Sequence, residues 1–170
     1  MNKIAVFGSA FNPPSIGHQS VIESLTNFDR VLLVPSISHA WGKEMLDYSK
    51  RCELLEAFIK DLSLKNVELS RIEERLYKPE KSVTTYAVLK ETQNEYPDDH
   101  LTFVIGPDNL FNFGKFYQAD KILEAWSVMA CPEIVKVRST DIRTRLTQNQ
   151  DISSLTTPRV CKLLTNSHYY

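Results

Sequence analysis

Short hydrophobic runs alternate along the chain with longer segments in which hydrophobic residues recur every three or four positions. Continuous runs are typical of buried strands, and the longer spacing is typical of amphipathic helices. The runs predict strands at 3–7, 30–35, 67–70, 101–105, 127–130 and 134–137. The periodic segments predict a first helix from about Gly17, and helices at 49–62, 83–95 with Ser82 as its cap, 117–125, 140–147 and 157–164.

This alternation of strands and helices predicts an α/β fold with a doubly wound, mostly parallel sheet. Parallel strands need crossover connections, which place helices on both faces of the sheet. We found no internal repeat or linker, so residues 1–170 are expected to form one domain. Ligands of such sheets bind beyond the carboxyl ends of the strands. The loops at 8–18, 35–43, 106–117 and 137–143 are therefore the candidate site.

The loop after the first strand carries the strongest chemical signal, with the sequence GSAFNPPSIGH at 8–18. Small residues at Gly8, Ser9 and Gly17 would let phosphates approach the backbone closely. A helix that starts near Gly17 aims its free N–H groups and its dipole at the same place. His18 is therefore expected to face a phosphate. The alternative is an ordinary strand-to-helix turn that happens to end in a histidine.

This loop resembles the first signature of the nucleotidylyltransferase superfamily, G-x-F-[D/N]-P-x-H-x-G-H, with Ser15 at its first histidine. The segment VRSTDIR at 137–143 resembles the second signature, [I/V]-S-S-T-x-[I/L]-R, with Arg138 in place of the first serine. On physical grounds, Ser139 and Thr140 would bring hydroxyls to a helix start, and Arg143 would add a forked donor for phosphate oxygens. Taken alone, the second segment also fits a helix cap beside a solvated arginine.

The resemblance implies adenylyl transfer from ATP with Mg²⁺. That chemistry needs no protein nucleophile, and it depends on positioning and on neutralising charge. The resemblance assigns catalytic roles to His18, as a donor to the α-phosphate, and to Arg143, on the leaving pyrophosphate. The implied ATP and phosphate ligands are Gly8, Ser9, Ala10, Phe11, Ser15, Gly17, Gly106, Asp108, Arg138, Ser139 and Thr140.

Weaker matches point to the bacterial nicotinate mononucleotide adenylyltransferases. The segment from 105 to 117 is similar to their IG-x-D-x-L…F-x-x-W-Y region, which implies that Phe116 stacks on the pyridine ring and Asp108 binds at the adenylate ribose. The implied mononucleotide ligands are Asn12, Lys43, Arg51, Thr85 and Phe116. The alternatives are that Phe116 belongs to the core of a short helix and that Arg51 is a surface partner within its own helix.

Three departures from the family pattern leave other functions open. They are Ser15, Phe116 in place of tryptophan, and a short connection at 131–136 where the family usually has a longer basic one. The acceptor could be nicotinate mononucleotide, nicotinamide mononucleotide, or another phosphorylated molecule such as phosphopantetheine. A non-catalytic nucleotide-binding paralogue is the alternative of a different class.

Composition bounds the remaining possibilities. The 170 residues are 42% hydrophobic and 24% charged with a net charge of −1, which suits one globular domain without bulk attraction to nucleic acid or an anionic membrane. The cysteines at 52, 131 and 161 have no metal or disulfide spacing. The start of the chain shows no leader pattern, and no hydrophobic run reaches membrane-spanning length. We therefore expect a cytoplasmic protein that binds ATP and a pyridine mononucleotide, and a homo-oligomer remains possible.

Overall fold

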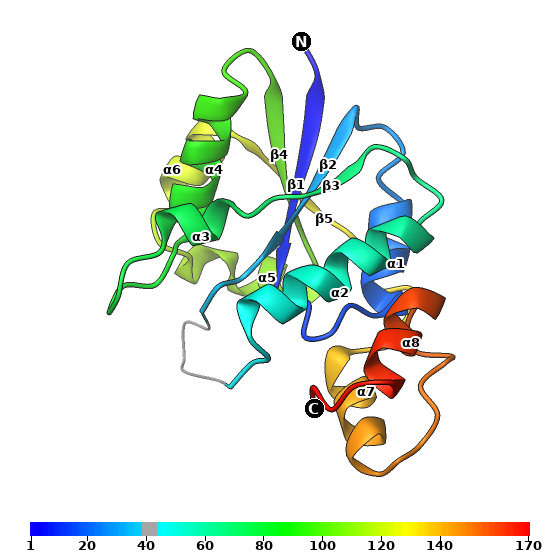
Figure 1. Ribbon diagram of the computed structural model, residues 1–170. Coiled ribbons are helices and arrows are strands. Elements are labelled where there is room, and N and C mark those ends of the chain that lie inside the picture. Colours follow the sequence, from blue (N-terminus) through cyan, green and yellow to red (C-terminus); the bar gives the residue numbers. More distant parts are fainter. Residues whose placement is uncertain (39–43) are drawn as a thin grey trace.

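Five parallel strands form a central sheet in the computed structural model, which describes residues 1–38 and 44–170 (Figure 1). The strands are β1 (Lys3–Ser9), β2 (Arg30–Pro35), β3 (Val67–Leu69), β4 (His100–Ile105) and β5 (Ser127–Ala130). They lie in the order β3-β2-β1-β4-β5, and every neighbouring pair is parallel. The predicted doubly wound α/β fold is confirmed. The strand order reverses between β1 and β4, so this is where a ligand site is expected.

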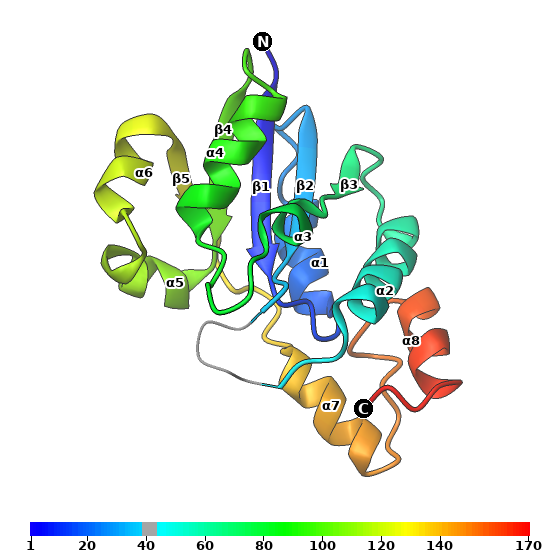
Figure 2. The same cartoon turned by 60° about the vertical axis from the view of Figure 1, so that its left-hand side comes forward.

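Helices cover both faces of the sheet (Figures 1 and 2). They are α1 (Ile16–Glu23), α2 (Tyr48–Asp61), α3 (Ile72–Leu76), α4 (Thr85–Glu95), α5 (Pro107–Asn112), α6 (Ala119–Ala125), α7 (Ser139–Thr147) and α8 (Pro158–Thr165), with a 3-10 turn η1 (Phe113–Lys115). α7 and α8 lie below the carboxyl edge of the sheet (Figure 2). Within the described residues, no helix is long and apolar enough to cross a membrane.

Two hydrophobic cores sandwich the sheet, because alternate residues of each strand face opposite sides. On one side, Ala5 and Phe7 of β1 pack with buried residues of α1, α2, α7 and α8. On the other side, Ile4 and Val6 pack with buried residues of α3, α4, α6 and η1. The central strands are therefore buried on both faces, which explains their continuous hydrophobic runs.

The predicted strand at 134–137 does not form. After β5 the chain turns away from the edge of the sheet, and Ile134 is 72% exposed. The backbone of this segment instead passes over the start of α1, where the carbonyl of Val137 accepts a hydrogen bond from the Ser15 hydroxyl. Tertiary contact with α1 therefore outweighs the β propensity of its branched residues.

Two helix predictions also need correction. Helix α4, which was expected at 83–95 with Ser82 as its cap, is instead capped by Thr84. The Thr84 hydroxyl accepts from the backbone N–H of Ala87. The short helices α3 and α5 were not predicted, because segments of five and six residues are too short to show helical periodicity.

Candidate active site

A pocket of about 340 Å³ opens beyond the carboxyl ends of β1 and β4, where the strand order reverses. Its wall combines the end of β1, the start of α1, the start of α5 and the segment that leads into α7. The pocket residues that the sequence analysis had singled out are Gly8, Ser9, Ser15, Gly17, His18, Gly106, Asp108, Arg138 and Ser139. The two signature segments, more than a hundred residues apart in the chain, thus meet in one cavity.

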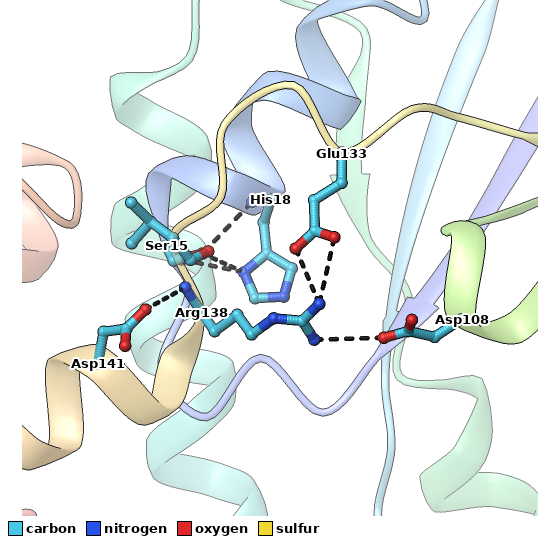
Figure 3. Close-up of polar contacts among 7 residues, drawn as sticks. Ser15, His18, Asp108, Glu133, Arg138 and Asp141 are labelled. Carbon is cyan, nitrogen blue, oxygen red and sulfur yellow. Dashed lines mark hydrogen bonds and ion pairs between the residues drawn. The ribbon is translucent and has the colours of Figure 1, made fainter.

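His18 turns Nδ1 toward Ser15 (Figure 3), and its side chain is part of the pocket wall. The backbone N–H of Ser15 donates to Nδ1 over 3.0 Å, so Nδ1 must be an acceptor and the ring proton belongs on Nε2. Nε2 lies 3.1 Å from the Ser9 hydroxyl. Burial lowers the pKa of His18 from 6.5 to about 4. The side chain is therefore a neutral Nε2–H donor at pH 7.

Ser15 is the N-cap of α1 and is only 1% exposed. Its Oγ accepts from the backbone N–H of His18 over 3.3 Å, lies 3.1 Å from Nδ1 of the same residue, and reaches the carbonyl of Val137 at 3.3 Å. In this capping box, the side chain of each residue accepts a hydrogen bond from the backbone N–H of the other. The hydroxyl that was expected to face a triphosphate is already engaged within the protein, and it influences the pocket through His18.

Arg138 lies at the mouth of the pocket between two carboxylates (Figure 3). Its guanidinium is 3.3 Å from Oδ2 of Asp108 and 3.0 Å from Oε1 of Glu133. Its backbone N–H donates to Asp141 over 2.9 Å, at the first turn of α7. The Arg138 side chain is 59% exposed, and exposed ion pairs are weak, so an incoming phosphate can compete for this cation.

Arg143 and Ser139 hold the carbonyl groups of the loop between β1 and α1. The Arg143 guanidinium donates to the carbonyl of Asn12 over 2.7 Å and to the Thr140 hydroxyl over 3.2 Å. The Ser139 hydroxyl donates to the carbonyl of Pro13 over 2.6 Å. In the part of the chain that the structure describes, Arg143 and Thr140 are not among the residues that line the pocket.

Arg51 is buried, with 1% exposure, so its interpretation as a surface partner is wrong. Its guanidinium donates to the carbonyls of Leu46, Ala10 and Ser36 at 2.7, 2.8 and 2.6 Å. Burial also lowers the pKa of Arg51. This side chain ties α2 to the loops that follow β1 and β2.

The middle of the β1–α1 loop turns its side chains into the protein. Phe11 is fully buried with a left-handed backbone at φ 48°, and its ring lies 4.7 Å from that of His18. Oδ1 of Asn12 accepts from the backbone N–H of Leu46 over 3.3 Å and from the Tyr170 hydroxyl over 2.5 Å. The Phe11 side chain therefore supports the His18 ring and is not itself exposed to a ligand.

Glycine is required at Gly17 because two parts of the chain approach each other there. A Cβ at this position would lie 2.3 Å from the carbonyl of Val137, closer than real contacts allow. By contrast, a Cβ on Gly106 would meet nothing within 4 Å, and one on Gly8 would make an ordinary contact at 3.8 Å. Gly17 is therefore required for close packing against the segment before α7, and its role in admitting a phosphate stays a prediction.

The predicted mononucleotide ligands are not gathered in this pocket. Phe116 is half-buried and packs on Phe113 and Phe103, with ring centres 5.2 and 6.2 Å away, which favours its interpretation as a core residue. Thr85 is the first residue of α4. Lys43 lies outside the described residues. Among the described residues, neither Thr85 nor Phe116 lines the pocket.

Sequence reasoning missed two acidic residues, Glu133 at the pocket and the buried Glu73. Glu133 lies in the short connection after β5 and contacts Arg138, and only its position five residues before that arginine could have suggested the pair. Glu73 of α3 is 8% exposed and accepts from the backbone N–H of Ile37 over 3.3 Å. Burial raises its pKa from 4.5 to about 7. Nothing in its local sequence distinguishes it from the exposed Glu74.

A parallel sheet with a pocket at its switch point, lined by a helix N-terminus, a neutral histidine and an arginine, defines an α/β nucleotide-binding protein. The family model described as cytidylyltransferase-like matches residues 6–155, and the chain belongs to this family. The predicted membership of the nucleotidylyltransferase superfamily is thereby confirmed.

Individual relatives agree with this assignment. A solved structure from Vibrio parahaemolyticus, provisionally named a nicotinate-nucleotide adenylyltransferase, is 60% identical with a TM-score of 0.89, covering 98% of this chain and 100% of that one. A curated protein of Anaeromyxobacter dehalogenans strain 2CP-C with the same provisional name is 24% identical over 182 residues, covering 99% and 96%. A Plasmodium falciparum nicotinic acid mononucleotide adenylyltransferase complexed with NaAD shares the fold, at 15% identity, a TM-score of 0.77 and 98% and 96% coverage.

Proposed function

We propose that this protein transfers the adenylyl group of ATP to nicotinate mononucleotide, forming the dinucleotide and releasing pyrophosphate. The observation that carries the chemistry is His18, held as a neutral Nε2–H donor on the wall of a pocket at the switch point of the sheet. The choice of acceptor rests on the 60% identical relative that bears the name of this activity.

The reaction requires that a phosphate oxygen of the mononucleotide attacks the α-phosphorus of ATP. The bond from this phosphorus to the bridging oxygen breaks, and pyrophosphate leaves with the electron pair. Charge grows on the α-phosphoryl oxygens and on the leaving group, so catalysis consists of positioning and fixed hydrogen-bond donors. Nε2–H of His18 is such a donor, and the positive end of the α1 dipole adds to its effect.

Arg138 is better placed than Arg143 to bind the leaving phosphates. Arg138 lines the pocket, and its two ion pairs are exposed enough to be exchanged for phosphate oxygens. Arg143 already donates to the carbonyl of Asn12. Its role in this proposal is to hold the β1–α1 loop, on which the α-phosphate would rest.

Magnesium fits the pocket as a companion of the triphosphate. The carboxylates of Asp108 and Glu133 line the pocket, while the described residues contain no cluster of three side chains that could hold a metal. Mg²⁺ usually keeps several waters and binds through substrate phosphates and one or two carboxylates. Asp108 would supply that carboxylate contact, and the ion would neutralise charge on the phosphates.

The proposal is tested by incubating the purified protein with ATP and Mg²⁺ and one acceptor at a time, and measuring released pyrophosphate. Nicotinate mononucleotide should give the highest kcat/KM, followed by nicotinamide mononucleotide, and phosphopantetheine should give none. Release with neither mononucleotide would refute the proposed acceptor. Calorimetric binding of ATP without turnover on any acceptor would select the non-catalytic alternative.

A further inference from the structure

One peptide group connects His18 to the far end of the chain. The carbonyl oxygen of Pro14 and the N–H of Ser15 belong to the same planar unit, in which the two groups point in opposite directions. The carbonyl accepts from the Thr156 hydroxyl over 2.8 Å. The N–H donates to Nδ1 of His18 over 3.0 Å. Whatever fixes the carbonyl therefore also aims the N–H at the histidine ring.

The next peptide group is held from the same side. The backbone N–H of Ile16 donates to the carbonyl of Leu155 over 3.0 Å. Leu155 and Thr156 thus hold two successive peptide groups on either side of Ser15. Both residues are buried, and they lie in the connection between α7 and α8, below the carboxyl edge of the sheet (Figure 2).

Thr156 acts from outside the pocket. Within the described chain it is not among the pocket-lining residues, and its side chain is 3% exposed. It also lies one residue beyond the stretch that the family model matches, 6–155. The signatures of the family therefore do not include it.

We propose that Thr156 is a positioning residue for His18. By holding the carbonyl of Pro14, its hydroxyl orients the peptide group that donates to Nδ1, and it thereby keeps the ring proton on Nε2, at the pocket. Hydrogen bonds in series also polarise one another, so the bond to the carbonyl strengthens the Ser15 N–H as a donor. The consequence for catalysis rests on the proposed adenylyl transfer, whereas the tautomer of His18 can be measured without any substrate.

The test compares Thr156→Val, which replaces the hydroxyl with a methyl group of similar size, with Thr156→Ser, which keeps the hydroxyl. Thr92→Val is the matched control, because the buried Thr92 hydroxyl also donates to a backbone carbonyl, that of Val88 at 2.7 Å, on the other face of the sheet. Thr156→Ala serves as a second variant if Thr156→Val does not fold. The readouts are the ¹⁵N shifts of the His18 ring in the ligand-free protein, the melting temperature, kcat, and the KM for ATP.

In wild type and Thr156→Ser, the two ring nitrogens should show the well-separated shifts of a fixed Nε2–H tautomer. In Thr156→Val these shifts should move toward each other, and kcat should fall about five-fold with the KM for ATP within about two-fold, as expected for one lost hydrogen bond that does not touch the nucleotide. Thr92→Val should lose comparable thermal stability and keep the His18 shifts.

A Thr156→Val or Thr156→Ala protein that is less stable but keeps wild-type His18 shifts would overturn the proposal, because the hydroxyl would then be merely structural. Equal changes of the His18 shifts in Thr92→Val would overturn it as well. If wild type shows no adenylyl transfer with any acceptor, the proposed function fails, and the His18 shifts still decide the role of Thr156.

Discussion

Replacing Glu73 with glutamine should stabilise this protein at neutral and alkaline pH and leave it unchanged in acid. The Glu73 carboxyl is buried at the start of α3, accepts one backbone hydrogen bond from Ile37, and has the Arg51 guanidinium as a favourable charge. Burial outweighs both contacts and raises its pKa from 4.5 to about 7. Glutamine keeps an oxygen that can accept from Ile37 and removes the cost of a buried charge.

The sign and size of this change in stability follow from proton linkage. Because the folded state holds the Glu73 proton more tightly than the unfolded state, stability is fully present below about pH 4.5 and is lost as the pH rises through about 7. One pKa unit corresponds to about 1.4 kcal/mol of folding free energy. The shift of the Glu73 pKa from 4.5 to about 7 therefore changes stability by roughly 3 kcal/mol. Glu73→Gln should therefore match wild type near pH 4 and exceed it by up to about 3 kcal/mol at pH 8.

His18 makes stability depend on pH in the opposite direction. Its folded pKa of about 4 lies below the ordinary 6.5, so its stability contribution is present above pH 6.5 and is lost as the pH falls toward 4. Between about pH 4.5 and 6.5 the two groups oppose each other in wild type. Without the Glu73 carboxyl, the effect of His18 protonation is no longer offset. The stability of Glu73→Gln should therefore fall steadily as the pH is lowered through this range.

The measurement is the free energy of unfolding from urea titrations at pH 4, 5, 6, 7 and 8. Glu74→Gln is the control, since it makes the same change on an exposed neighbour that pairs with Arg71, and it should shift the free energy by less than about 1 kcal/mol at any pH. If Glu73→Gln differs from wild type by the same amount at pH 4 and pH 8, its carboxyl is not the titrating group and the reasoning fails.

Substitutions at three further positions test the contacts around the pocket. Gly17→Ala should destabilise the fold by about 2 kcal/mol or more, because its Cβ would meet the Val137 carbonyl at 2.3 Å; a melting temperature equal to wild type would contradict this. Ser15→Ala should lower stability by about 1 kcal/mol as a lost N-cap and should also reduce kcat through His18, whereas Ser15→Thr should restore the cap. Glu133→Gln should leave Arg138 paired with Asp108 alone and lower the KM for ATP by about two- to five-fold, an effect that 0.5 M salt should erase; an unchanged KM in low salt would show that the pair does not compete with phosphate.

Patterning predicted the central strands well because they are buried on both faces. The runs at 30–35 and 101–105 correspond to β2 and β4 within a residue, since almost every position in them must be apolar. The run at 134–137 has the same composition and no strand. The carbonyl of Val137 instead accepts from Ser15 at the start of α1, a contact across more than a hundred residues of chain that local propensity does not contain.

The candidate site shows a different limit of prediction from sequence. A side chain's type tells which hydrogen bonds it can donate, but not which acceptor lies next to it in the fold. Arginine and serine at 138, 139 and 143 are suited to phosphate oxygens, and they are equally suited to carboxylate and carbonyl oxygens. In the fold, Arg138 meets two carboxylates at the pocket mouth, while Ser139 and Arg143 meet carbonyls of the β1–α1 loop. Signature residues can therefore be necessary for the same site in two ways, by binding the ligand or by holding the loop that binds it. The capping box between Ser15 and His18 belongs to the second kind, since a serine at this position can preserve the histidine's geometry without contacting a nucleotide itself.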